Sequence, residues 1–160
     1  MELNIAALLL QGIPEMIALA ALNFAIARTR LRWKIIFWIG VAQGFLVYGI
    51  RLLPVPFGVH TIAMTLFFVF CLIRFGNVSF LRGFYSAFLG TAFLILYEFL
   101  THLFFVRIMG LSLDTPGLED SIIWILMGWP QVILFFLTAL LINRLSSRAS
   151  SHEGRSRGAF

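Results

Sequence analysis

The stretch IIWILMGWPQVILFFLTALLI, from Ile122 to Ile142, contains no charged residue. A helix needs about 20 predominantly apolar residues to cross the roughly 30 Å hydrocarbon layer of a bilayer. This stretch meets that requirement in a chain that is 61% hydrophobic and only 12% charged, whereas soluble domains are usually about a quarter charged. It therefore predicts a membrane-spanning helix.

Four further segments satisfy the same length requirement. They run from Asn4 to Ala27, Ile35 to Leu53, Val59 to Ile73 and Phe84 to Val106. The mean hydropathy of the 160 residues is +0.97, and too few residues remain outside these segments to build a separate soluble core. We predict an all-α, polytopic membrane bundle of five transmembrane helices in residues 1–143.

The basic residues near the ends of these segments predict their orientation, because Lys and Arg resist translocation across the membrane. All but two of the twelve fall on one side, namely Arg28, Arg30, Arg32, Lys34, Arg74, Arg82, Arg144, Arg148, Arg155 and Arg157. The other side holds only Arg51 and Arg107. We expect the N-terminus outside the cell, the C-terminus in the cytoplasm, and a multi-pass location in the plasma membrane.

The two ends of the chain carry different signals. The N-terminus lacks the basic region of a secretory signal and contains Glu2, so the first span is expected to remain in the mature protein. Residues 144–160 are rich in Ser, Arg and Gly and poor in apolar side chains. We expect this tail to be disordered, lying against anionic lipid.

Polar residues inside the predicted spans are the candidates for function, since an ionisable group within the bilayer costs a few kcal/mol on insertion scales. Glu15 follows Pro14 in the first span, and Glu98 and His102 share one face of the fourth because they lie four residues apart. Their positions along the spans place all the polar candidates in the outer half of the bundle, namely Glu15, Arg51, His60, Glu98, His102 and Gln131.

Two interpretations of this outer polar set remain open. In the first, these side chains form one externally open site for a ligand or a proton. In the second, they stabilise the bundle by bonding to one another, Glu98 with His102 and Glu15 with Arg51.

Other site classes lack the residues that they need. His60 and His102 have no fixed ligand spacing, so no metal, haem or other cofactor is expected. The sequence contains no motif of a metalloprotease, serine hydrolase or nucleotide-binding loop, and we do not expect an enzyme. The positive charges sit at helix ends rather than along one face, which argues against nucleic acid. The single cysteine, Cys71, is expected to be a buried packing residue.

The second span contains a GxxxG pattern at Gly40 and Gly44. Glycines at this spacing let two helix backbones approach closely. The pattern is expected to serve packing within the chain, with homodimerisation as the alternative.

Four short motifs stand out along the chain, namely QGIPE at Gln11–Glu15, the loop RLLPVPFGVHT at Arg51–Thr61, Glu98 late in the fourth span, and Pro130–Gln131 in the last. Together they resemble the multi-span sensor domains of AgrC-like, GHKL-class histidine kinases of Gram-positive bacteria. The resemblance covers nearly all of the chain up to Asn143. It implies a bundle that detects an external signal and passes it on through the last helix.

The phosphoacceptor helix and the ATP lid of those kinases do not follow Asn143. The resemblance therefore implies a non-enzymatic sensor or regulatory module for a small or peptide ligand, signalling to a separate histidine kinase or other membrane protein. Within it, the turn from Pro54 to Phe57 either faces the signal or merely connects two helices. The alternative function is the substrate-binding membrane subunit of an energy-coupled uptake transporter.

Overall fold

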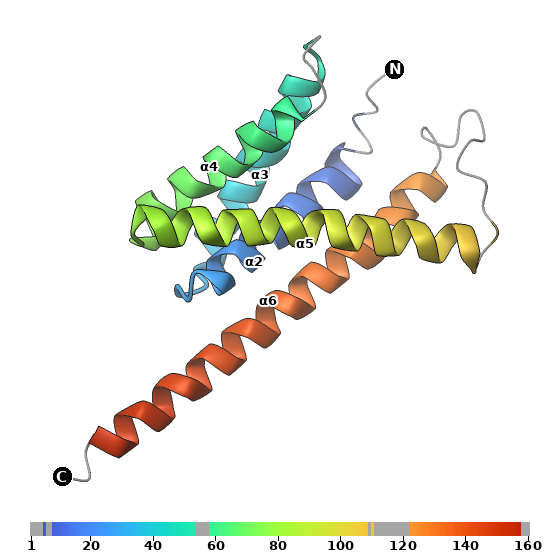
Figure 1. Cartoon of the computed structure of the whole chain (residues 1–160). Coiled ribbons are helices and arrows are strands. Elements are labelled where there is room, and N and C mark those ends of the chain that lie inside the picture. Colours follow the sequence, from blue (N-terminus) through green and yellow to red (C-terminus); the bar gives the residue numbers. More distant parts are fainter. Residues whose placement is uncertain (1–4, 6–7, 54–57, 109, 111–121, 158–160) are drawn as a thin grey trace.

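The computed structural model in Figure 1 describes the backbone of residues 5, 8–53, 58–108, 110 and 122–157, and the side chains of these except 51, 122–124 and 147–157. Over these residues the chain is helical, without strands. The elements are the π-helix η1 (Leu8–Gly12) and the α-helices α2 (Ile13–Ile26), α3 (Trp33–Arg51), α4 (Val59–Gly76), α5 (Phe80–Arg107) and α6 (Ile122–Arg157).

Five helical segments are long and apolar enough to cross a membrane, with η1 and α2 together forming the first of them. The prediction of an all-helical chain with five such helices is confirmed. The bounds differ most at the C-terminal end of α6, which continues through Arg157, and next at the turn between the third and fourth segments, where α4 ends at Gly76 and α5 begins at Phe80. The chain reverses there within three residues, because Asn77 adopts the left-handed conformation (φ 52°) that Asn tolerates better than most residues.

The centre of the bundle is α2, which packs against each of the other four α-helices. Its segment from Ala18 to Ala25 is at most 1% exposed along its whole length. Four of these eight positions are alanines, and small side chains allow neighbouring backbones to come close on every side. A helix that is apolar all round is expected at such an enclosed position.

The longest helix is α6, with 36 residues, or about 54 Å at 1.5 Å per residue. Its first half packs against α2 and α5, and Figure 1 shows its C-terminal half projecting away from the other helices. The helix continues through Arg157, into residues 144–160, for which the composition predicts disorder. No proline follows Pro130, so nothing in the backbone chemistry stops the helix in this segment.

Candidate functional site

The best-defined polar contact between helices joins the first span to α6. Gln131 Nε2 donates a hydrogen bond of 2.9 Å to Glu15 Oε1. Gln131 is only 6% exposed, and Glu15 is half-buried. One turn away, Gln11 packs so closely against Gly128 that a Cβ at position 128 would collide with its side-chain amide. We call Gln11, Glu15, Gly128 and Gln131 the polar seam.

Proline shapes the backbone on both sides of the polar seam. Pro14 precedes Glu15 at the start of α2, directly after the π-helical turns of η1, and Pro130 precedes Gln131 inside α6. A proline within a helix removes one backbone hydrogen bond and crowds the preceding turn, and isolated π-helical turns are frequent at functional sites. The two polar partners therefore sit where their helices are least constrained by backbone hydrogen bonds.

The structure does not bring Glu98 and His102 to this seam. Both side chains are exposed on α5, where they line a shallow surface hollow of about 260 Å³ together with Ile95 and Phe99. Among the described residues, neither has a hydrogen bond or an ion pair, including with each other. In the described part of the chain, Glu98 and His102 lie on α5, apart from the contact between Gln131 and Glu15.

The remaining members of the predicted set lie at the end of the bundle where α3 ends and α4 begins. Arg51 is the last residue of α3, and its side chain lies outside the described residues. His60 is half-buried in the first turn of α4. The Pro54–Phe57 turn between them, expected to face the signal or to connect the helices, also lies outside the described part.

The glycines of the GxxxG pattern face α2. A Cβ added at Gly40 would lie 2.5 Å from the Cα of Ile17, and one added at Gly44 would lie 3.0 Å from Cγ1 of Ile13. Helices α2 and α3 therefore cross with their backbones almost in contact at Gly40. This use of the pattern is within the chain.

Two buried amides were missed when polar residues were sought in the sequence. Asn23 and Gln43 are both 0% exposed. Asn23 Nδ2 donates to the carbonyl of Leu19 at 3.1 Å, and its side chain packs against Gly90. Neither polar atom of Gln43 has a hydrogen-bond partner among the described residues. The sequence signal for both residues is an uncharged amide side chain within an apolar run.

Hydroxyl groups provide two more links between helices. Tyr97 and Thr138 share a hydrogen bond of 2.6 Å between α5 and α6. The hydroxyl groups of Thr65 and Thr91 lie 3.1 Å apart between α4 and α5, and each also lies within hydrogen-bond distance of the carbonyl one turn earlier in its own helix. Because each hydroxyl has one hydrogen, at most two of these three contacts are hydrogen bonds at any moment. These contacts hold α5 against α4 and α6.

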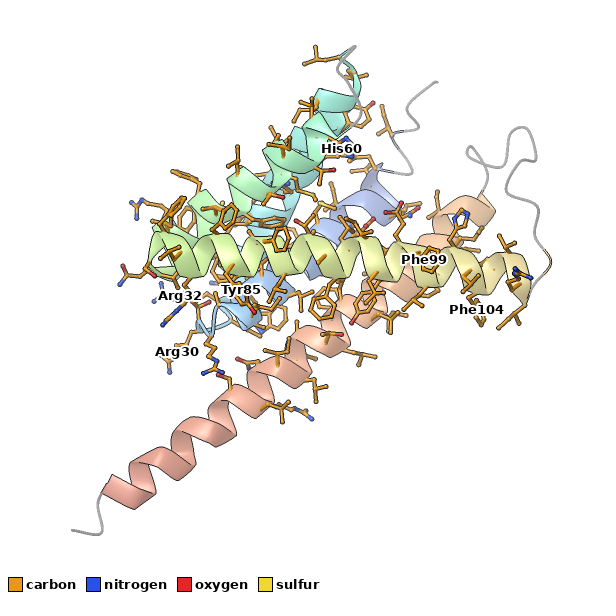
Figure 2. All side chains as sticks on the ribbon, viewed as in Figure 1. Arg30, Arg32, His60, Tyr85, Phe99 and Phe104 are labelled. Carbon is orange, nitrogen blue, oxygen red and sulfur yellow. The ribbon has the colours of Figure 1, made fainter. Side chains whose placement is uncertain are left out.

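Seven of the basic residues whose side chains the structure describes gather at one end of the bundle, which we call the basic end. They are all exposed, namely Arg28, Arg30, Arg32, Lys34, Arg74, Arg82 and Arg144, whereas Arg107 ends α5 at the opposite end. In Figure 2, Arg30 and Arg32 lie at the same end as Tyr85, whereas His60 lies toward the opposite end. The basic residues that the sequence predicts to lie on one side are thus found at the turn between α2 and α3, at the turn between α4 and α5, and on α6, at the same end of the molecule.

In the described part of the chain, no three His, Cys, Asp or Glu side chains gather to form a metal site. Cys71 is buried in α4.

Comparison of the chain with protein-family models, with curated proteins and with solved structures found no match.

Proposed function

We propose that this chain is a non-enzymatic membrane sensor or regulatory module in which the polar seam is the responsive site and α6 carries its state out of the bundle. The observation that carries the proposal is the hydrogen bond from Gln131 to Glu15, because it joins the enclosed central helix to the one helix that projects beyond the others. A change at either side chain acts directly on the packing of α6 against α2.

The energy of this contact suits a switch. Interhelical hydrogen bonds within membranes contribute about 0.6–2 kcal/mol, which is comparable to the free energies that separate two populated conformations. Glu15 is half-buried rather than enclosed, so a proton or the polar group of a ligand has access to it. Pro130 leaves the neighbouring turn of α6 with one backbone hydrogen bond fewer, and α6 can bend there at low cost.

The resemblance to AgrC-like sensor domains supports the same function, since the polar seam includes both Gln11 and Glu15 of the QGIPE motif and Gln131 of the last span. The signal would leave through the basic segment of α6 toward a histidine kinase or another membrane protein. An uptake subunit is the competing function. Purification from native membranes together with an ATPase pair would favour uptake and contradict the sensor proposal.

The proposed orientation places the basic end in the cytoplasm and both the N-terminus and the polar seam toward the outside of the plasma membrane. The exposed residues Ser79 at the basic end and Ile108 at the other end provide a test. On a Cys71→Ala background, an impermeant thiol reagent should label Ile108→Cys in intact cells and Ser79→Cys only after permeabilisation. The reverse pattern would overturn the orientation.

The motion of α6 can be measured with spin labels at Ser79→Cys and Leu145→Cys in the Cys71→Ala protein, reconstituted in liposomes. Leu145 lies on α6 beside Arg144, and its side chain is 56% exposed. Because a proton is the simplest probe of a carboxyl group, we expect a step in pH from 8 to 5 to shift the distribution of distances between the labels. Glu15→Gln, which keeps the shape but cannot ionise, should abolish the shift.

The matched control is Glu98→Gln, an equivalent change at an exposed carboxyl outside the seam. Measured at a ratio of protein to lipid low enough to keep the labelled chains apart, it should leave the pH response intact. A distribution that is the same at both pH values, or a response that Glu98→Gln removes and Glu15→Gln does not, would contradict the proposed role of the seam.

A further inference from the structure

The C-terminal half of α5 is the least enclosed part of the bundle. All the buried residues of this helix lie between Gly83 and Thr91, and every residue from Ala92 to Arg107 is half-buried or exposed. Five of the 28 residues of α5 are buried, against nine of the 14 residues of α2. In Figure 1, the C-terminal end of α5 lies far from α3 and α4.

Glu98 and His102 lie on the outward side of this half-helix. Tyr97 marks the inward side, because its hydroxyl bonds to Thr138 and its ring packs 5.2 Å from that of Phe135, centroid to centroid. With 3.6 residues per turn, Glu98 is turned from Tyr97 by about 100° and His102 by about 140°. Both side chains line the surface hollow together with Ile95 and Phe99.

The position of Glu98 along α5 keeps it within the hydrocarbon layer. The helix has 28 residues and spans about 42 Å, so Glu98 lies about 27 Å from its start. A layer roughly 30 Å thick contains that point wherever along the helix the layer is placed. An ionisable side chain facing lipid there costs a few kcal/mol, and acyl chains offer it no hydrogen-bond partner.

We propose that this face of α5 packs against the same face of a second copy of the chain. A two-fold axis along the membrane normal gives an interface in which each contact occurs twice, so Glu98 of each copy meets the partner's His102. The two side chains are separated by one turn, about 6 Å along the helix, which their combined lengths span. Because the face carries both an acid, Glu98, and a base, His102, the same face of a second copy offers each of them a partner.

The rest of the molecule agrees with α5 as the interface between copies. The GxxxG pattern of α3, the other candidate for self-association, is already occupied by Ile13 and Ile17 of α2. Ile95 and Phe99, about 60% exposed beside the polar pair, supply apolar surface to the same contact. This inference is independent of the proposed sensor function, since either a sensor or a transport subunit can be a dimer.

Adjacent residues of α5 offer a matched test. Ile95 and Leu96 are both exposed and at nearly the same depth, but they point about 100° apart, and only Ile95 lies beside His102. In liposomes at a low ratio of protein to lipid, on a Cys71→Ala background, Ile95→Cys should form an oxidised dimer several-fold faster than Leu96→Cys. Equal rates, a faster reaction of Leu96→Cys, or no dimer with either variant would overturn the interface.

Exchanging the two side chains tests the pairing itself. Glu98→His alone and His102→Glu alone place like groups opposite each other, and each should weaken association by about tenfold, whereas the double exchange should restore it. Association is read from energy transfer between fluorophores at Ser79→Cys on separate Cys71→Ala chains, as protein is diluted with lipid. Single variants that associate like the parent, or a double variant no better than the singles, would contradict the proposed pairs.

Discussion

The central helix α2 and the C-terminal half of α5 have similar apolar sequences but opposite environments. The segment from Ala18 to Ala25 is enclosed by four other helices, whereas the segment from Ala92 to Arg107 contains no fully buried residue. Each region carries a carboxyl group nearby. Glu15 is held by Gln131 inside the bundle, and Glu98 faces outward.

The role of an intramembrane carboxyl group therefore depends on the face of the helix from which it projects. A carboxyl group between two helices of one chain couples those helices and stabilises their packing. A carboxyl group that projects away from its own chain does not stabilise the packing of that chain. The free-energy cost of placing it in the membrane is removed only when a partner molecule binds it.

The largest effect is expected where α2 and α3 cross. Gly40→Ala adds a Cβ that would lie 2.5 Å from the Cα and 2.6 Å from the backbone N of Ile17, so the helices must separate. We expect the free energy of unfolding in bicelles to fall by about 2–3 kcal/mol. The control on the same helix is Gly49→Ala, where no atom lies within 4 Å, and helix propensity should raise stability by up to about 1 kcal/mol. Equal effects of the two substitutions would show that the crossing is not this close.

The next effect compares the two carboxyl groups directly. Gln131→Leu removes the donor to Glu15 and should lower the free energy of unfolding by about 1–2 kcal/mol. Glu98→Leu should leave unfolding of the monomer in detergent unchanged, because Glu98 has no partner among the described residues of its own chain. If Glu98→Leu destabilised the monomer as much as Gln131→Leu, the outward placement of Glu98 would be wrong.

A buried amide without partners should be dispensable for stability. Gln43 is 0% exposed, and neither of its polar atoms is bonded within the described residues. Gln43→Leu should raise the melting temperature, with a gain of about 1 kcal/mol from the relieved desolvation. A clear loss of stability would show instead that Gln43 has a partner that the present structure does not contain.

The smallest effect concerns the link between α5 and α6. Tyr97→Phe and Thr138→Val each remove the hydrogen bond of 2.6 Å, and each should cost about 0.6 kcal/mol, the average for such bonds in membranes. Because both variants remove the same bond, the double variant should cost little more than either single one. Additive costs would indicate that the hydroxyl groups act separately.

The five spans could be predicted because they depend only on apolar length. The basic residues at the turns were also correctly grouped on one side. Gly40 and Gly44 were predicted to allow a close approach, but the sequence could not show which helix approaches. The helix that approaches Gly40 and Gly44 is α2, through Ile13 and Ile17. The only sign in the sequence that α2 is enclosed by other helices is its run of small residues.

The candidate site was less predictable because depth in the membrane does not specify direction. Glu15, Gln131, Glu98 and His102 were assigned to one region by depth. The spacing of Glu98 and His102 correctly places them on one face of a helix. Residues such as Leu96 and Leu100 make the other face equally apolar, so no pattern tells which face of α5 turns inward. The contact with Tyr97 decides it.

The enclosure of α2 and the exposure of α5 can be measured most directly by photolabelling the reconstituted wild-type protein with a diazirine reagent dissolved in the lipid phase. Mass spectrometry then locates the modified residues. The account predicts modification of Leu96, Leu100 and Leu103 on α5, and none from Ala18 to Ala25 on α2. Labelling of α2 at a level equal to that of α5 would contradict the central position of α2 and the arrangement built around it.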